Sequence, residues 1–275
     1  MDNGVISTCQ FYFQQIGVLH NSGIIQGEKA GMSIPKVIHY CWFGKGKMPK
    51  LAQKCISSWQ KYCPDYEIVC WSEENFDISQ NKYAKEAYDA GKWAFVSDYA
   101  RLKVLYDEGG IYLDTDVELL KPLDSLIDQN GYMGFDDTGL IATGLGFACE
   151  KGNELVGALL ADYEGISFVM SDGSYDLTPC PDRNTNTLIA KGMDTGCKDQ
   201  IFMGIHMLPE DYLCPMKYTT GRKKITSNTY CIHHFSASWT SATSKRTTFI
   251  KRIIGVKLYE KLYGKFLHKF KWLEW

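Results

Sequence analysis

The sequence feature that most constrains this chain is the run from Gly109 to Glu118, which reads GGIYLDTDVE. A short apolar strand there ends in two aspartates one residue apart, Asp114 and Asp116. Side chains alternate between faces in an extended chain, so both carboxylates are expected on the same side. Two such carboxylates repel each other unless a cation lies between them, and their oxygens suit Mg²⁺ or Mn²⁺. The run therefore predicts a divalent-metal site at a strand end, with a solvated acidic turn as the alternative.

A predicted helix precedes this strand. Apolar residues recur with helical periodicity after Ser97, which is a candidate N-cap, and Gly109–Gly110 is a candidate C-terminal stop. Asp98 and Arg101 stand three residues apart and share one face of the first turn. This pair is either an intrahelical salt bridge or a clamp for an anion and for sugar hydroxyls beside the two aspartates.

The segment from Ile34 to Gly44, IPKVIHYCWFG, together with the block from Ser97 to Asp116, closely resembles glycosyltransferase family 32. That family contains bacterial capsular and exopolysaccharide transferases, and the same parts recur more distantly in glucosylating toxin domains. The resemblance runs from about Ile34 to Trp239. It implies a GT-A fold, a nucleotide-sugar donor, a divalent metal ion and retention of the anomeric configuration.

The resemblance also implies roles for individual residues. Asp116 and His233 are expected to bind Mn²⁺ or Mg²⁺ directly, with Asp114 between the metal and the ribose. Asp98 and Arg101 are expected to bind hydroxyls of the donor sugar. Arg101 is also expected to stabilise the departing phosphate, as the metal does.

The nucleotide of the donor, with a UDP-sugar favoured, is expected at the end of the first strand, beside Cys41 and Trp42. In the similar toxin domains a tryptophan at the position of Trp42 stacks on uracil, although a strand tryptophan is often a core residue. Tyr112 is expected near the ribose. Lys45 and Lys47 either help to hold phosphate or are simply solvated.

The last motif runs from Tyr230 to Trp239 and reads YCIHHFSASW. The resemblance places His233 at the metal-binding position and His234 at a variable one. It implies that Ser236 is a secondary metal ligand or a phosphate contact. Trp239 is expected to form a flap over the diphosphate.

Strands and helices alternate from Ile34 onward. Strands are expected at residues 37–42, 66–71 and around 111, and helices at 50–62, 83–90 and after 97. This alternation predicts a Rossmann-like α/β sandwich with a mainly parallel central sheet flanked by helices. Ligands bind beyond the carboxyl ends of strands in such sheets, where Trp42 and Asp114 are expected.

The middle of the chain is less informative. Asp136 and Asp137 form a second acidic pair that either lines the sugar pocket or forms a polar turn. The segment 143–147 supplies small residues for a pocket wall. The segment 178–185 stands where family members often carry a Gly-Pro element, and here that pattern is degraded.

The catalytic domain is expected at residues 32–240, between two different ends. Residues 1–31 lack the pattern of a secretory signal, and we interpret them as a non-native extension before a start at Met32, with a genuine terminal extension as the alternative. The tail at 241–275 carries nine Lys/Arg against two Glu from Lys245 onward, with apolar residues at helical spacing. It is expected to form a basic amphipathic helix on a membrane surface, or to pack on the catalytic domain.

Composition is consistent with this interpretation. The 275 residues, 45% of them hydrophobic, can form a sizeable core, and a net charge of −2 argues against general nucleic-acid binding. Ten cysteines without a Cys-x-x-Cys motif favour reduced thiols in a bacterial cytoplasm, and no apolar stretch reaches the length of a membrane span.

The sequence therefore predicts a retaining, metal-dependent hexosyltransferase in capsular, exopolysaccharide or other surface-glycan synthesis. Its acceptor is expected to be a saccharide, either free or lipid-linked. The protein is expected in the cytoplasm, at the inner face of the membrane. Two alternatives remain open: a protein-modifying effector with the same donor site, and a non-catalytic module that binds a sugar nucleotide or docks on a membrane.

Overall fold

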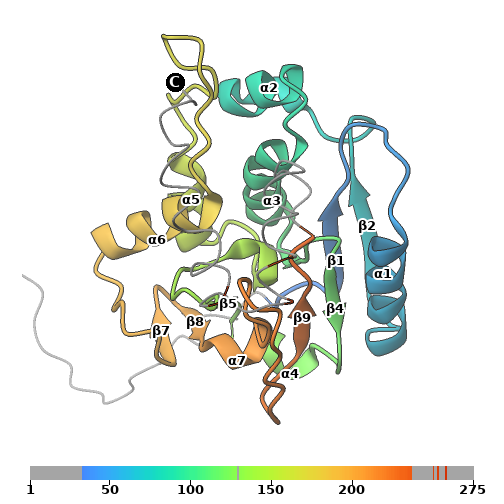
Figure 1. The fold of residues 1–275 in the computed structure, drawn as a ribbon. Helices are drawn as coiled ribbons and strands as arrows, with labels where there is room; N and C mark the ends of the chain where they lie inside the picture. The colour runs from blue at the N-terminus through green and yellow to red at the C-terminus, as the bar shows by residue number, and fades with distance from the viewer. Residues whose placement is uncertain (1–32, 129, 237–249, 251–252, 254–257, 259–275) are drawn as a thin grey trace, which may run out of the picture. The chain divides into compact units, whose positions relative to one another are not determined.

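The computed structural model describes residues 33–128, 130–236, 250, 253 and 258 of the chain (Figure 1). The predicted extension at 1–31 and the predicted flap residue Trp239 lie outside the described residues. The predicted tail at 241–275 also lies outside them, apart from three single positions.

The helices are α1 (Lys50–Tyr62), α2 (Lys82–Asp89), α3 (Trp93–Glu108), α4 (Asp124–Ile127), α5 (Glu154–Ala161), α6 (Cys180–Ala190) and α7 (Glu210–Leu213), with 3₁₀ turns η1 (Ile78–Gln80) and η2 (Thr143–Leu145). The strands are β1 (Val37–Cys41), β2 (Glu67–Trp71), β3 (Gly110–Tyr112), β4 (Val117–Leu119), β5 (Tyr132–Gly134), β6 (Phe147–Cys149), β7 (Gln200–Phe202), β8 (Ile205–Leu208) and β9 (Cys231–His233).

Seven strands form the central sheet, in the order β2-β1-β3-β6-β5-β8-β7. The pairs β1–β2, β1–β3 and β5–β8 are parallel, and β3–β6, β5–β6 and β7–β8 are antiparallel. A second, two-stranded sheet pairs β4 with β9. The mixed sheet with flanking helices fits the predicted GT-A type of α/β fold.

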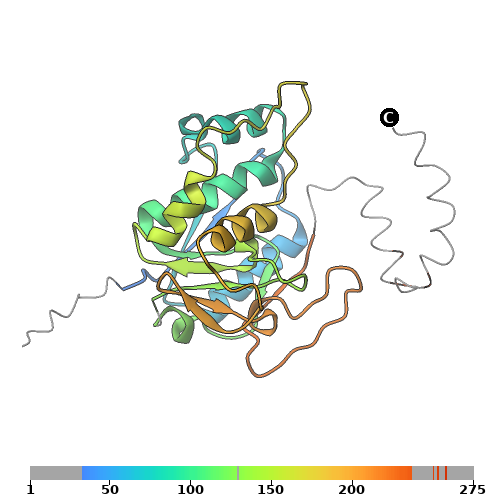
Figure 2. The same cartoon turned by 90° about the vertical axis from the view of Figure 1, so that its left-hand side faces the viewer.

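Two hydrophobic cores lie on the two faces of the central sheet. Helices α2, α3 and α5 contribute to one core, and α1, α4 and α7 to the other. Successive residues of one strand point into different cores: Tyr112 of β3 lies in the first core and Ile111 in the second. Figure 2 shows the resulting layers of helix, sheet and helix. This arrangement confirms the predicted sandwich.

The predicted N-cap of the central helix is wrong. Helix α3 begins at Trp93, and Ser97 lies inside it with its Oγ donating to the Trp93 carbonyl at 3.1 Å. The residue before the helix, Lys92, makes no side-chain capping bond, so the sequence carries no capping signal at the true start. The predicted stop is correct, because α3 ends at Glu108 and Gly109 is its C-cap, with a φ of 70°.

A buried histidine holds the turn between α3 and β3. Nε2 of His39 lies 3.1 Å from the Gly109 carbonyl, and Nδ1 lies 3.0 Å from Nε1 of Trp71. Because the indole N–H donates to Nδ1, Nε2 carries the proton and donates to the carbonyl. A Cβ on Gly110 would lie 2.8 Å from the Val37 carbonyl oxygen, so only glycine fits there. The double glycine thus lets β3 lie directly against β1.

No helix in the described ranges is both long and apolar enough to cross a membrane. The nine cysteines within those ranges are all free thiols.

Candidate active site

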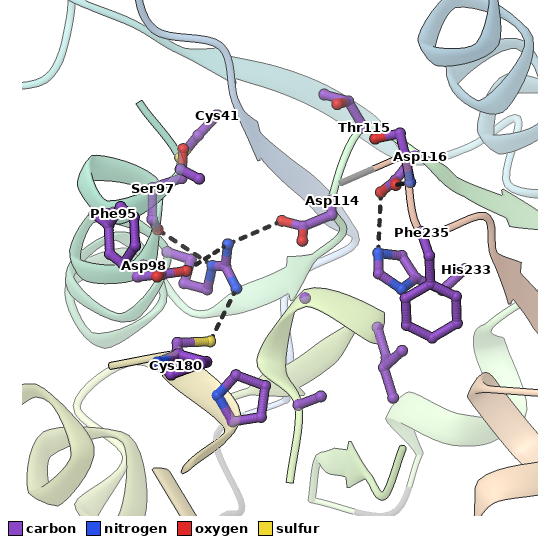
Figure 3. A pocket seen from close by; sticks show the side chains of 18 of the residues that line it. Cys41, Phe95, Ser97, Asp98, Asp114, Thr115, Asp116, Cys180, His233 and Phe235 are labelled. Carbon is purple, nitrogen blue, oxygen red and sulfur yellow. Dashed lines mark hydrogen bonds and ion pairs between the residues drawn. The ribbon is translucent and has the colours of Figure 1, made fainter. Parts of the chain in front are cut away.

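A cavity of about 470 Å³ opens where β1 and β3 end, and Figure 3 shows part of its lining. The lining includes nearly all of the predicted site residues: Cys41, Trp42, Asp98, Arg101, Tyr112, Asp114, Asp116, His233 and Ser236. The chain thus brings together three segments that are far apart in sequence, as the resemblance implies. Trp239 was predicted to join them, but it lies outside the described residues.

Arg101 is the centre of a buried charge cluster. Its Nη2 lies 3.1 Å from Oδ1 of Asp98, one turn earlier on α3, and 3.1 Å from Oδ1 of Asp114 (Figure 3). Burial opposes the charge of the guanidinium, but the carboxylates more than offset it, so the pKa of Arg101 stays above its ordinary value. Burial raises the pKa of Asp98 to about 6, although Arg101 acts in the opposite direction.

Asp114 is fixed from two further sides. The Tyr112 hydroxyl donates to its Oδ1 at 2.9 Å, and Tyr112 is only 1% exposed. A Cβ at Gly144 would collide with Oδ2 of Asp114, so the absence of a side chain there is required. Tyr112 therefore positions a carboxylate in addition to lining the cavity.

The sequence predicted that the two aspartates lie in an extended chain, and this prediction is wrong. Strand β3 ends at Tyr112, and residues 114–116 form a turn in which the Val117 N–H donates to the Asp114 carbonyl at 3.0 Å. The turn directs Asp114 toward Arg101 and Asp116 toward β9. Alternation along a strand is therefore not the reason that the carboxylates are close.

Asp116 forms an ion pair with His233. Nε2 of His233 lies 3.0 Å from Oδ1 of Asp116, and the Ser236 N–H donates to Oδ2 at 2.7 Å. Burial disfavours the charge on both groups, but each charge favours the other. The pKa of Asp116 is therefore lowered and that of His233 raised.

These residues fit a divalent metal ion. One ligand atom from each of Asp114, Asp116 and His233 can be chosen so that all three lie within 4.8 Å of one another. The second ring nitrogen of His233, Nδ1, is buried without a hydrogen-bond partner among the described residues. Two carboxylates and an imidazole are a ligand set that Mn²⁺ and Mg²⁺ accept.

The neighbouring histidine belongs to a different environment. Nε2 of His234 lies 2.8 Å from Oε2 of Glu118, whose other oxygen lies 2.8 Å from Nζ of Lys54. In the β4–β9 ladder Val117 pairs with His233. The residues that follow these two, Glu118 and His234, are not among those that line the cavity. His234 therefore joins the two strands, while His233 faces Asp116.

The end of the cavity beside β1 and the start of α3 contains two tryptophans, Trp42 and Trp93. Nε1 of Trp42 donates to the Gly46 carbonyl at 2.8 Å, which ties the indole to its own loop. Trp93, which sequence reasoning missed, packs against Gly44, where a Cβ would lie 2.6 Å from the indole ring. Burial raises the pKa of the neighbouring Cys41 thiol to about 12, so that thiol is protonated at neutral pH.

Sequence reasoning also missed the contribution of α6 to the cavity. Cys180 begins this helix, and its Sγ lies 3.4 Å from Nη1 of Arg101 (Figure 3). The Thr143 hydroxyl lies 3.5 Å from the same nitrogen and accepts from Nδ2 of Asn184 at 3.2 Å. Proline at the first positions of α6 was the available signal, because it marks a helix start inside the degraded segment.

Comparison with known proteins is consistent with this site. Residues 49–133 match the family model of a "Glycosyltransferase sugar-binding region containing DXD motif". Asp114 and Asp116 are the aspartates of the Asp-x-Asp sequence within those residues. Residues 49–133 are therefore similar to a glycosyltransferase sugar-binding region.

Similar proteins come from a yeast and from a bacterium. Inositol phosphoceramide mannosyltransferase 3 of Schizosaccharomyces pombe is 31% identical over 47% of this chain and 37% of that protein. Subversion of eukaryotic traffic protein A of Legionella pneumophila is 26% identical over 53% of this chain and 27% of that protein. The chain thus spans about a third of the length of these relatives. Among solved structures, PaToxG glycosyltransferase has a TM-score of 0.44 at 19% identity, over 58% of this chain and 70% of that one.

Proposed function

We propose that this protein is a retaining, divalent-metal-dependent glycosyltransferase that moves a sugar from a nucleotide donor, with a UDP-sugar favoured, to a saccharide acceptor. The observation that carries the proposal is the meeting of two charge clusters in one cavity. Arg101 joins Asp98 and Asp114, while Asp116 faces His233, and the sequence around the aspartates matches a sugar-binding region.

The two charge clusters have different roles in binding the donor. Asp114, Asp116 and His233 would hold a divalent ion, which when bound neutralises charge on the departing diphosphate. Arg101 is buried and permanently charged, so it can bind donor-sugar hydroxyls or phosphate without reorganising. Asp98 beside it accepts hydrogen bonds from sugar hydroxyls.

The nucleotide lies, in this proposal, between β1 and the start of α3. Trp42 and Trp93 both line this part of the cavity, and a flat indole suits a nucleobase. The ribose lies near Asp114. Ser236, whose N–H already binds Asp116, stands where it can contact the phosphates or the metal.

The biological role proposed is assembly of a capsular, exopolysaccharide or other surface glycan at the inner face of a bacterial membrane. Its support is the resemblance to capsule-building transferases and the basic, apolar composition of residues 245–275. A polybasic amphipathic segment is attracted to anionic lipids.

A panel of UDP- and GDP-sugars tests the donor chemistry. With Mn²⁺ present, at least one donor should release its nucleoside diphosphate, and EDTA should stop that release. NMR of the first-formed product should show the anomeric configuration of the donor. No metal-dependent release from any donor would contradict the proposed activity, and an inverted product would contradict retention.

A further inference from the structure

One wall of the cavity runs continuously from the predicted metal ligand to a second acidic loop. The Phe235 ring lies 4.4 Å from that of His233, and the Tyr218 ring lies 5.3 Å from Phe235, both in edge-to-face geometry. The Tyr218 N–H then donates to Oδ2 of Asp137 at 3.2 Å. Three separate loops, after β9, α7 and β5, supply these residues, and all of them line the cavity.

Asp137 differs from the three acids near the predicted metal site. Asp98, Asp114 and Asp116 lie against cations, either Arg101 or His233, whereas Asp137 forms no ion pair with any described residue. Its Oδ1 likewise has no hydrogen-bond donor in the part of the chain that the structure describes. The side chain is half buried, and that burial raises the pKa of its carboxyl.

The adjacent Asp136 behaves as an ordinary turn residue. Its Oδ1 accepts from the Thr138 N–H at 2.8 Å, from the Thr138 hydroxyl at 2.6 Å and from the Leu140 N–H at 3.1 Å. The two possibilities that the sequence left open therefore divide between the two residues. Asp136 stabilises the loop, and Asp137 keeps an acceptor oxygen at the cavity.

The chemistry of this wall suits a neutral, hydroxyl-bearing ring and not the donor diphosphate. Lys217 acts on Asp137 from a distance without forming an ion pair with it. A carboxylate that forms no ion pair repels phosphate but accepts a hydrogen bond from a hydroxyl. Aromatic rings have electron-rich faces that attract the C–H groups of a sugar ring, in the way they attract the edges of other rings. We propose that Asp137, Tyr218 and Phe235 form the acceptor subsite, in which the Asp137 carboxylate accepts a hydrogen bond from a hydroxyl of the acceptor saccharide. This inference rests on the proposed function, because it assigns the second substrate of the same site.

The test separates use of the acceptor from cleavage of the donor. The donor that wild-type protein hydrolyses is supplied with Mn²⁺, alone or with a panel of p-nitrophenyl hexosides, and both nucleotide release and glycoside product are measured. Asp137→Ala should raise the KM for the accepted glycoside roughly tenfold to a hundredfold, as expected for loss of a hydrogen bond to a charged group. Hydrolysis of the donor without acceptor should stay within twofold of wild type. Asp137→Asn keeps one acceptor oxygen and should recover part of the loss.

Two further variants distinguish a binding wall from a merely structural one. Tyr218→Ala should raise the acceptor KM with the donor KM unchanged, whereas Thr219→Ala, its exposed neighbour, should change neither. Asp136→Asn should lower thermal stability and leave the ratio of transfer to hydrolysis unchanged.

Four outcomes overturn the proposal: an unchanged acceptor KM in Asp137→Ala, an equal loss of donor hydrolysis, transfer to none of the glycosides, or transfer to a peptide only. In the first three cases donor hydrolysis by wild type would leave the proposed function standing, whereas transfer to a peptide only would also contradict its saccharide acceptor. Absence of donor hydrolysis would instead remove the proposed function itself.

Discussion

Two histidines, the buried His39 and the partly buried His233, lie in contrasting surroundings. Among the described residues, the hydrogen-bond partners of His39 are neutral groups, the Gly109 carbonyl and the Trp71 indole, and burial lowers its pKa to about 4. His233 lies against Asp116, and the carboxylate raises its pKa despite burial. An imidazole among neutral groups is a fixed part of the scaffold. An imidazole beside a carboxylate is protonated more readily, and a metal ion that binds both groups can replace that proton.

The Asp116 carboxylate is what allows the surroundings of His233 to hold a metal ion. Its removal should therefore have the largest effect on donor cleavage. Asp116→Asn keeps the shape of the side chain but removes the charge that would hold the metal. We expect donor cleavage to fall by about 10³-fold or more, because metal stabilisation of a leaving group supplies several kcal/mol. Nucleotide release measured at saturating Mn²⁺, with circular dichroism as the folding control, checks this prediction. Turnover close to wild type would remove the Asp-x-Asp assignment.

The second prediction moves Asp114 without changing a charge. The added methyl in Gly144→Ala would collide with the Asp114 carboxylate, and the backbone at residue 144 is not in the left-handed region that requires glycine. Displacing a positioned group by about 1 Å costs on the order of a hundredfold in rate, so kcat/KM should fall by that order. Gly196→Ala, where only the Lys198 side chain and a carboxylate oxygen lie nearby, is the matched control. Equal activity of the two variants would show that Asp114 can move freely.

The neutral His39 should make the free energy of unfolding depend on pH. In the unfolded chain His39 has its ordinary pKa of 6.5, whereas in the fold the pKa is about 4. As pH falls below 6.5 the unfolded state therefore binds a proton that the folded state does not, and stability is lost until about pH 4. Linkage gives a loss of about 2 kcal/mol between pH 7 and pH 5 from this group.

His39→Gln is the variant that isolates this contribution. Its amide can donate to the Gly109 carbonyl but does not titrate, so the variant should be less stable at pH 7 and lose less stability on acidification. Urea unfolding of both proteins at pH 7 and pH 5 measures the difference. Identical losses in the two proteins would show that His39 is not held neutral.

The smallest expected effect is on donor binding, and it compares Trp71, beside His39, with Trp42, in the cavity. The Trp71 indole is bonded to His39, whereas Trp42 lines the cavity. Stacking on a base contributes about 1–3 kcal/mol, so Trp42→Ala should raise the donor KM roughly tenfold. The kcat should stay nearly constant, because stacking persists through the chemical step. A loss confined to kcat would mean that Trp42 supports the reacting geometry and not nucleotide binding.

The same contrast explains what the sequence could predict. The α/β alternation, the bounds of α1 at Lys50–Tyr62 and the stop at Gly109 follow from local periodicity and turn chemistry. The resemblance brought Asp98, Arg101, Asp114, Asp116 and His233 together as candidates. Local signals failed where tertiary contacts decide, as at the uncapped start of α3 and in the turn that separates the two aspartates.

The missed residues of the site are those that act only after folding. Cys180 contributes because the start of α6 reaches Arg101. Gly144 was not missed, because it belongs to the segment 143–147 that was predicted to supply a pocket wall, and it lines the cavity beside Asp114. A cysteine in the segment 178–185 does not by itself predict a binding role. Phe235 and Tyr218 likewise become a wall only because loops after β9 and α7 meet at the cavity.

Binding of Mn²⁺ to paired histidine variants tests the central claim most directly. Calorimetric titration of Mn²⁺ in the presence of UDP should give a dissociation constant at least tenfold higher for His233→Ala than for wild type, because second-shell changes alone cost tenfold or more. His234→Ala, which loses only the Glu118 bond, should bind Mn²⁺ like wild type. The reverse order, or equal affinity in both variants, would contradict a metal site formed by Asp114, Asp116 and His233.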